Sequence, residues 1–161
     1  MILREDLTNI FLMQNLEADM LDRLRPYIRI ARYREGDVIF QEGDAPTRFY
    51  MIKTGKVLLE KKIANSVMVS LGSIKSGYSF GWSAIFENPY TVYAICAENS
   101  EIFYVDNQKM IALMNEDHSI GYLMMQNLSK IIKDRMDRME EQFIRAIKEN
   151  SDFNEITGQK K

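Results

Sequence analysis

Between residues 35 and 44 the chain reads Glu35-Gly36-Asp37-Val38-Ile39-Phe40-Gln41-Glu42-Gly43-Asp44. A short apolar run rich in β-branched residues lies between two Gly-Asp pairs, which is typical of a strand bounded by tight turns. Glycine tolerates a positive φ, and an aspartate side chain can accept hydrogen bonds from nearby backbone amides. The stretch therefore predicts a short strand of a β structure.

The same pattern fills the chain from Tyr27 to Val105. Lys53-Thr54-Gly55-Lys56 and Lys75-Ser76-Gly77 predict two more turns. The β-type runs between the turns cover residues 38–40, 49–52, 56–59, 67–71, 91–97 and 102–105. Many short strands at this spacing favour a sandwich, a roll or a barrel.

Helical patterns flank this region. Two short helices are predicted before it, ending before Pro26. Their apolar faces consist of Leu7, Ile10 and Phe11 in the first and of Leu16, Met20, Leu21 and Leu24 in the second. After Val105, Asp106 or Asn107 can cap a helix that carries Met110, Ile111 and Met114.

A much longer helix is predicted from about Ser119 to Lys148, starting near Asp117. Its apolar stripe repeats in alternating steps of four and three residues, which is the seam of a coiled coil. The seam residues are Met125, Ser129, Ile132, Met136, Met139, Phe143 and Ala146. The spacing predicts a homodimer, with packing of the stripe on the chain's own core as the alternative.

Composition limits the class of protein. The chain has 161 residues, 46% of them hydrophobic and 27% charged, with a net charge of −2. These values indicate one globular domain, without the basic charge that attracts nucleic acid and without a run long enough to span a bilayer. We expect a cytoplasmic protein in which Cys96, within an apolar run, packs as a small hydrophobe.

The ordered set of motifs resembles the cyclic-nucleotide-binding domains of catabolite-activator-type regulators, cyclic-nucleotide-dependent kinases and gated channels. The resemblance rests on Tyr33, Gly36, 38–40, Gly43-Asp44, 49–52, Gly55, Val57, Gly77, Phe80-Gly81 and Ala97. It implies an eight-stranded β-roll, jelly-roll-like, with N-terminal helices and a long C-terminal dimerisation helix. The expected parts are helices and roll in 1–118, the long helix in 119–148 and a polar tail in 149–161.

In such a family the ligand lies in a cassette formed by a strand end, a short helix and the next strand. The corresponding segment here is Phe80 to Val92, and its candidate ligand-binding residues are Phe80, Gly81, Trp82, Ser83, Ala84, Tyr90, Thr91 and Val92. Glycine lets the backbone approach a ligand, and the amides around Ser83 and Ala84 can point toward an anion. The expected ligand is a cyclic nucleotide or another small anion.

Two departures put a nucleotide ligand in question. Trp82 stands where the family places a glutamate on the ribose, and Thr91 where it places an arginine on the phosphate. Hydrogen bonds to charged groups contribute about 1.5–3 kcal/mol each, so their loss weakens binding. Either Trp82 fills the former pocket, or Trp82 and Tyr90 stack on a different ligand; the alternative for Tyr90 is an aromatic at the rim beside Pro89.

Four functions remain to be compared. The first is a regulatory sensor that binds a small anion and signals through its dimer helix to an unknown downstream protein. The second is a ligand-independent dimerisation or protein-interaction module.

The other two functions lack the residues they need. An enzyme of the cupin-like type would need several histidines on a metal, whereas the chain has only His118, expected as a solvated residue at the head of the long helix. A transcription factor would need a helix-turn-helix after that helix, and the sequence ends too soon for one. We therefore expect no catalysis, no metal, no membrane and no direct contact with nucleic acid.

Overall fold

The computed structural model describes residues 2–149 of the chain. Its short helical segments at the N-terminal end are α1 (Arg4–Thr8), η1 (Phe11–Met13), α2 (Ala18–Leu24) and η2 (Arg25–Tyr27). Both predicted helices are present, but the first ends at Thr8, so Phe11 belongs to the following 3-10 helix η1 and Ile10 is the residue before it. The second ends before Pro26, as predicted.

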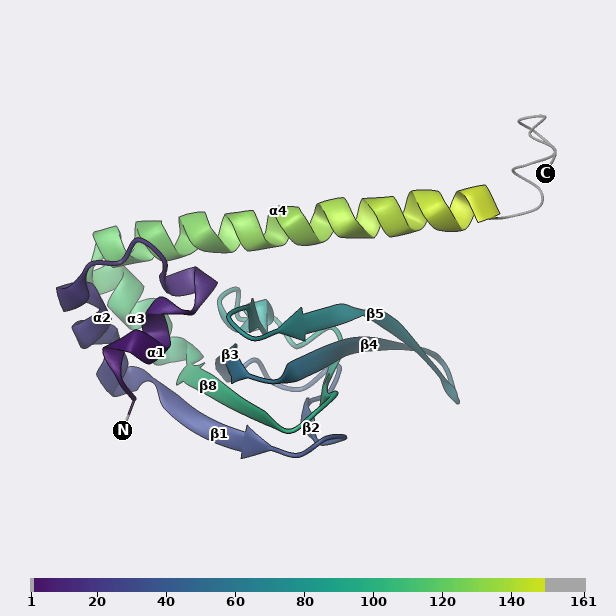
Figure 1. Cartoon of the computed structure of the whole chain (residues 1–161), viewed down its shortest axis with the longest axis horizontal. Coiled ribbons are helices and arrows are strands. Elements are labelled where there is room, and N and C mark those ends of the chain that lie inside the picture. The colour runs from purple at the N-terminus through teal and green to yellow at the C-terminus, as the bar shows by residue number, and fades with distance from the viewer. Residues whose placement is uncertain (1, 150–161) are drawn as a thin grey trace. The chain divides into compact units, whose positions relative to one another are not determined.

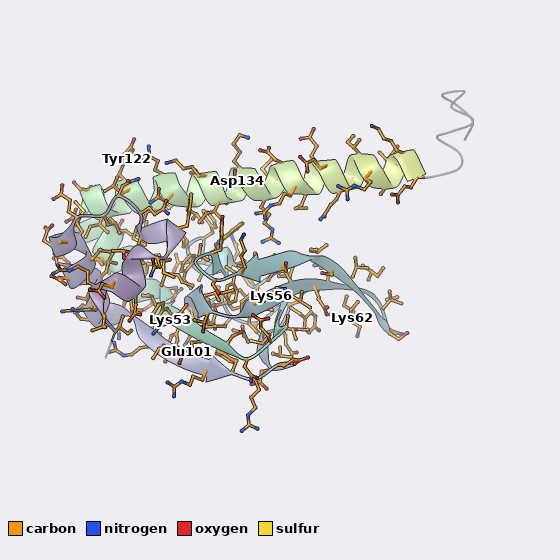
Figure 2. The ribbon with its side chains drawn as sticks, viewed as in Figure 1. Lys53, Lys56, Lys62, Glu101, Tyr122 and Asp134 are labelled. Atoms are coloured by element: carbon orange, nitrogen blue, oxygen red, sulfur yellow. The ribbon has the colours of Figure 1, made fainter. Side chains whose placement is uncertain are left out.

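Eight strands form two antiparallel sheets, which confirms the predicted roll (Figure 1). The strands are β1 (Arg29–Tyr33), β2 (Val38–Phe40), β3 (Arg48–Thr54), β4 (Lys56–Ala64), β5 (Val67–Lys75), β6 (Ser79–Phe80), β7 (Tyr93–Cys96) and β8 (Ser100–Asp106). One sheet has the order β1-β8-β3-β6 and the other the order β2-β7-β4-β5. The hairpin of β4 and β5 extends past the other strands, and Lys62 lies toward its far end (Figures 1 and 2).

The alternation of side chains along each strand produces two sets of buried residues. In β3, Tyr50 and Ile52 belong to the cluster inside the roll, whereas Phe49 and Met51, which alternate with them, are buried on the opposite face. The inner cluster contains Phe40, Tyr50, Ile52, Val57, Leu59, Phe80, Tyr90, Ala94, Cys96 and Ile102. Cys96 is 1% exposed, which confirms its expected packing role.

Ion pairs on the outer surface join α1 to β3 and connect β1, β3 and β8 with one another. Lys53 Nζ lies 3.2 Å from Asp6 Oδ1 and 3.8 Å from Glu101 Oε2, and Arg32 Nε lies 2.8 Å from Glu101 Oε1. Figure 2 shows Lys53 and Glu101 close together on β3 and β8. Exposed ion pairs of this kind stabilise a fold only weakly.

After the roll come α3 (Asn107–Glu116) and α4 (His118–Glu149). Asp117 accepts hydrogen bonds from the backbone N–H groups of Ser119 and Ile120, at 2.9 and 3.1 Å, and so caps α4. His118 is exposed in the first turn, as expected. The helix begins one residue before and ends one residue after the predicted 119–148, and of the predicted tail 149–161 only Glu149 lies within the described residues.

The described chain divides into two compact units within α4, between Asn127 and Leu128. Asn127 shows why the first turns of α4 belong with the N-terminal unit. Its buried side-chain amide donates to the carbonyl oxygens of Leu12 at 3.1 Å and Gln14 at 2.7 Å. This unit therefore extends past the predicted boundary at residue 118.

Candidate functional site

The cassette expected to hold a ligand leads from the end of β6 to the start of β7. Phe80 ends β6, Gly81 adopts a left-handed conformation with φ 74°, and Trp82–Ala84 form the 3-10 helix η3. A short helix between a strand end and the next strand is therefore present, as the resemblance implies. The chain then turns at Glu87, a non-glycine residue with φ 54°, before it reaches Tyr90.

Gly81 is required by packing inside the chain as well as by its backbone conformation. A Cβ atom at this position would lie 3.0 Å from Cδ2 of Tyr50 and 3.5 Å from Cε1 of Phe40. The carbonyl oxygen of Arg48 would lie equally close, at 3.5 Å, so the glycine lets the backbone approach these groups. Its predicted role toward a ligand stays a prediction. Any larger residue here would have to displace the aromatic interior of the roll.

The amides of η3 differ in their availability to an anion. The Ala84 N–H donates to Gly81 O at 3.1 Å, and the Ile85 N–H donates to Trp82 O at 2.9 Å. The Ser83 carbonyl closes the turn by accepting from Phe86 and Asn88. The prediction that the Ala84 amide faces an anion is therefore wrong, because this amide is already engaged and Ala84 is fully buried.

Tyr90 lies inside the roll and not at its rim, which corrects the alternative favoured from the sequence. Its side chain is 4% exposed, and its ring stacks on Phe40 with a centroid distance of 3.8 Å. The hydroxyl donates to the carbonyl oxygen of Arg48 and accepts from the Arg48 N–H at 3.2 Å. Its backbone pairs with Asp44 O at 3.1 Å and with Gly43 N at 2.8 Å.

Four aromatic rings occupy the interior beside the cassette. Tyr50 and Phe80 stack at 5.2 Å, and Phe40 lies 5.7 Å from Tyr50 and 6.0 Å from Phe80. Together with Tyr90 they belong to the inner cluster of buried residues. Trp82 itself is half-buried and does not belong to this cluster, so the structure argues against the alternative in which Trp82 fills the interior.

The interior offers phenol groups and no charge. Burial raises the pKa of both Tyr50 and Tyr90, so both hydroxyls stay protonated well above neutral pH. Burial also raises the pKa of Cys96. Neutral groups of this kind can donate a hydrogen bond to an anion but cannot neutralise it.

A cationic side chain that was missed from the sequence, Lys61 of β4, reaches the cassette. Its Nζ donates to the carbonyl oxygen of Thr91 at 2.8 Å and forms an ion pair with Glu42. Thr91 is exposed, and Val92 is half-buried against the inner cluster. No local pattern reveals Lys61, because only the pairing of β4 with β7 brings it to the cassette.

The predicted seam of α4 differs between its two halves. Met125 and Ile132 are half-buried and Ser129 is exposed. Farther along, the exposed fractions of Met136, Met139 and Phe143 are 64%, 48% and 65%. Large apolar side chains thus stand open to solvent on the second unit, where the heptad spacing predicts a partner helix.

Two further observations concern the whole described chain. Among residues 2–149 no helix is both long and apolar enough to cross a bilayer. Within the same range, no three His, Cys, Asp or Glu side chains gather in a way that could hold a metal ion.

The chain is similar to a family model and to proteins of known type. The model described as "Cyclic nucleotide-binding domain" matches residues 30–117. The cGMP-dependent protein kinase of Plasmodium berghei is 36% identical over 87 residues, which are 53% of this chain and 10% of the kinase. Human cGMP-dependent protein kinase 2 is 25% identical over 100 residues, 62% of this chain and 13% of the kinase. The chain thus spans only about a tenth of the length of these relatives.

Solved structures agree on the fold. A cyclic nucleotide-binding domain from Methylobacillus flagellatus superposes with a TM-score of 0.80 at 16% identity, over 89% of this chain and 83% of the other. The catabolite activator protein of Thermus thermophilus gives a TM-score of 0.69 at 22% identity, over 85% and 63% of the two chains. Because the family model covers more than half of the residues, the chain belongs to the cyclic nucleotide-binding domain family.

Proposed function

We propose that this chain is a regulatory sensor module in which the cassette from Phe80 to Val92 responds to a small anionic ligand and α4 carries the response to a partner. The observation that carries the proposal is the cassette itself. Gly81 at one end and Tyr90 at the other both contact the aromatic interior of the roll. A ligand that moves either end must therefore rearrange the core.

In this proposal Tyr90 controls access to the interior of the roll. A cyclic nucleotide enters beside the cassette only if the Tyr90 ring leaves Phe40 and its hydroxyl leaves Arg48. A binding-competent state that is only fractionally populated reduces the apparent affinity by that same fraction. Lys61 supplies the nearby positive charge once its ion pair with Glu42 opens.

A chain of contacts leads from the roll to α4. Gly77 pairs through its N–H with Ile52 O at 2.8 Å, and its own carbonyl accepts from the Phe11 N–H at 2.8 Å. The next residue, Leu12, accepts from the buried amide of Asn127 in α4. A shift of the inner strands is passed along these contacts to the first turns of the dimerisation helix.

The second candidate is a ligand-independent dimerisation and protein-interaction module. It is favoured by the same tyrosine, because a buried ring with two backbone partners stabilises a permanently closed roll. The departures at Trp82 and Thr91 from the family's charged anchors support this reading too. In this case the roll binds no ligand, and the chain contacts its partners through α4 and the outer surface of the roll.

Calorimetric titration with cAMP and cGMP distinguishes the two candidates. The proteins to compare are the wild type, Tyr90→Ala, and the double variant Trp82→Glu/Thr91→Arg, which restores the charges that the resemblance implies. A sensor binds in the wild type at millimolar ligand or better, and Tyr90→Ala tightens binding. If neither the wild type nor Tyr90→Ala binds while the double variant does, the natural chain is a scaffold that has lost its anchors.

Tyr90→Phe guards the experiment against misfolding of Tyr90→Ala. It keeps the ring on Phe40 and removes only the hydroxyl that bonds to Arg48. It therefore tests whether loosening Tyr90 changes ligand affinity in a roll that keeps its packed core. A wild type that is silent toward both nucleotides, and also toward inorganic phosphate, removes the anionic-ligand proposal.

The remaining parts of the proposal concern partners and location. We infer a homodimer through α4, a downstream protein of unknown identity, and a cytoplasmic setting. We infer no catalysis and no direct contact with nucleic acid or membrane.

A further inference from the structure

A groove lies outside the roll, where η2 leads into β1. Its volume is about 500 Å³, and its lining residues are Ile2, Arg25, Pro26, Ile28, Arg29 and Ile30. Ile28 is 2% exposed and closes the floor, whereas Ile30 is 42% exposed at the side. A volume of this size falls in the range of sites that hold small molecules or peptide side chains.

The segments that carry the groove also expose other apolar side chains. Leu3 is 53% exposed and Tyr27, in η2 next to the lining residues Pro26 and Ile28, is 40% exposed. Within the groove itself the exposed apolar side chain of Ile30 is the open part of the lining, and exposed apolar surface of this kind marks sites where other molecules bind.

Two of the lining residues, Arg25 and Arg29, carry positive charge. Asp22 forms ion pairs with both Arg4 and Arg25, and its Oδ1 lies 3.7 Å from Arg25 Nη1. Among residues 2–149, Arg29 has carbonyl partners only: its Nη1 donates to Pro26 O at 2.6 Å and to Ile28 O at 3.0 Å. Of the two arginines that line the groove, Arg25 shares Asp22 with Arg4, whereas Arg29 is held by backbone carbonyl groups. Two guanidinium groups beside an apolar lining favour an occupant with carboxylates.

The groove opens onto the free edge of a sheet. β1 is the terminal strand of the order β1-β8-β3-β6 and pairs with β8 on one side, from Arg29 opposite Tyr104 to Tyr33 opposite Ser100. Figure 1 shows β1 at the margin of the roll. An edge strand offers a row of backbone N–H and C=O groups to an added strand. A peptide can use these groups, whereas a lipid headgroup cannot use them in the same way.

We propose that this groove docks an extended, acidic segment of a partner protein. An apolar side chain of that segment lies over Ile28 and Ile30, its carboxylates pair with Arg25 and Arg29, and its backbone runs along β1. The proposal does not depend on a ligand in the cassette, because it uses residues of η2 and β1 and not of the segment from Phe80 to Val92.

Fluorescence anisotropy with the full chain tests the proposal. The probe is a labelled synthetic peptide with two leucines flanked by glutamates, and its comparison peptides replace the glutamates with lysines or the leucines with serines. We expect the acidic leucine peptide to bind, and each replacement to weaken binding at least about tenfold, or about 1.4 kcal/mol. Added salt weakens the same complex.

Variants of the groove localise the binding. Arg29→Glu and Ile30→Asp each weaken the peptide at least about tenfold, whereas Lys62→Glu, the same charge change on the β4–β5 hairpin, leaves it unchanged. Arg25→Glu serves as a further variant if circular dichroism shows that Arg29→Glu does not fold. Equal binding of the lysine peptide, no binding at all, or binding unaffected by the groove variants overturns the proposal. The alternative occupant is a membrane, which is tested by co-sedimentation of the chain with vesicles containing phosphatidylserine. If the chain sediments with these vesicles, the groove variants abolish this, and the acidic peptide does not bind, the groove binds lipid and the proposal is overturned.

Discussion

The ring of Tyr90 lies flat on that of Phe40, with an interplanar angle of 12°, while its hydroxyl bridges the N–H and carbonyl groups of Arg48. This one side chain therefore joins the cassette to β2 through the stack and to β3 through the hydrogen bonds. The cassette is held closed from the inside of the roll and not from its surface.

Removing the Tyr90 ring should lower the free energy of unfolding more than removing its hydroxyl. Tyr90→Phe loses two hydrogen bonds to Arg48 and should destabilise the fold by about 1–2 kcal/mol, and Tyr90→Ala by about 3–5 kcal/mol. Urea unfolding measures both values. Tyr122→Ala, at a tyrosine that is 66% exposed, is the matched control and should change little. Equal stability of Tyr90→Ala and the wild type would show that the ring is not packed in the core.

Much of the roll could be predicted because its turns are local. Glycines at positions 36, 43, 55 and 77 were each predicted to bound a strand, and all four have positive φ. The pattern of β-type runs missed β1 and β6, although the resemblance implied a strand end at Phe80. Arg29–Tyr33 contains two arginines and lacks a clear apolar run, and Ser79–Phe80 is only two residues long, so their pairing with β8 and β3 depends on tertiary contacts.

The errors at the site have a different cause. The sequence left two alternatives for Trp82, that it fills the former pocket or that it stacks with Tyr90 on a different ligand, and it favoured Tyr90 at the rim; in the structure Tyr90 takes the interior position. Which of two aromatic residues in a loop turns inward depends on partners far away in sequence. Phe40 and Arg48, which hold Tyr90, come from 42 or more positions earlier in the chain. Composition and periodicity carry no information about such contacts.

Gly55 should be the glycine least tolerant of substitution among the turn glycines. Its φ is 105°, and an added Cβ would lie 2.8 Å from Cα of Ser100 and 2.6 Å from its Cβ. At Gly36, with φ 84°, nothing lies within 4 Å of such an atom. Gly36→Ala should therefore lower the free energy of unfolding by about 1–2 kcal/mol, through the strained backbone conformation alone. Gly55→Ala should lower it by about 1–3 kcal/mol more, because the added Cβ also clashes with Ser100.

Thermal and urea unfolding of both variants check this difference. The double variant Gly55→Ala/Ser100→Gly should recover part of the loss, because the serine side chain is the nearest obstacle. Equal costs at the two glycines would mean that the close approach to Ser100 does not constrain the turn.

The cap of α4 makes the stability depend on pH. The Ile120 N–H lowers the pKa of the Asp117 carboxyl most, and Arg23 and the Ser119 N–H lower it further against the opposing effect of burial. Because the folded pKa lies below the unfolded value of about 3.9, the ionised carboxylate stabilises the fold above that value. This contribution is lost as the pH falls through the folded pKa.

Asp117→Asn is the test of this linkage. The variant should be less stable than the wild type at neutral pH, and the difference should narrow in strong acid, where both side chains are uncharged. Asp19→Asn, at an exposed position of α2, controls for a general change in charge. A difference between Asp117→Asn and the wild type that stays constant with pH would contradict the assignment.

Asn127 should contribute to stability through its side-chain amide. Asn127→Ala leaves the carbonyl oxygens of Leu12 and Gln14 without this donor and should destabilise the fold by about 1–3 kcal/mol. Gln126→Ala, one position earlier and exposed, should be nearly neutral. If the two substitutions have equal effects in urea unfolding, the contact between α4 and η1 is not a stabilising one.

The proposed dimer can be tested with two neighbouring residues of α4. Phe143 lies in the predicted seam and Ile144 next to it lies outside, and their exposed fractions are 65% and 45%. Phe143→Asp should dissociate the dimer, because a charge buried in the seam is costly, whereas Ile144→Asp should sediment as the wild type does. Circular dichroism checks that both variants keep their helix. If the wild type is a monomer, or if Phe143→Asp remains a dimer, the seam does not join two copies of this chain.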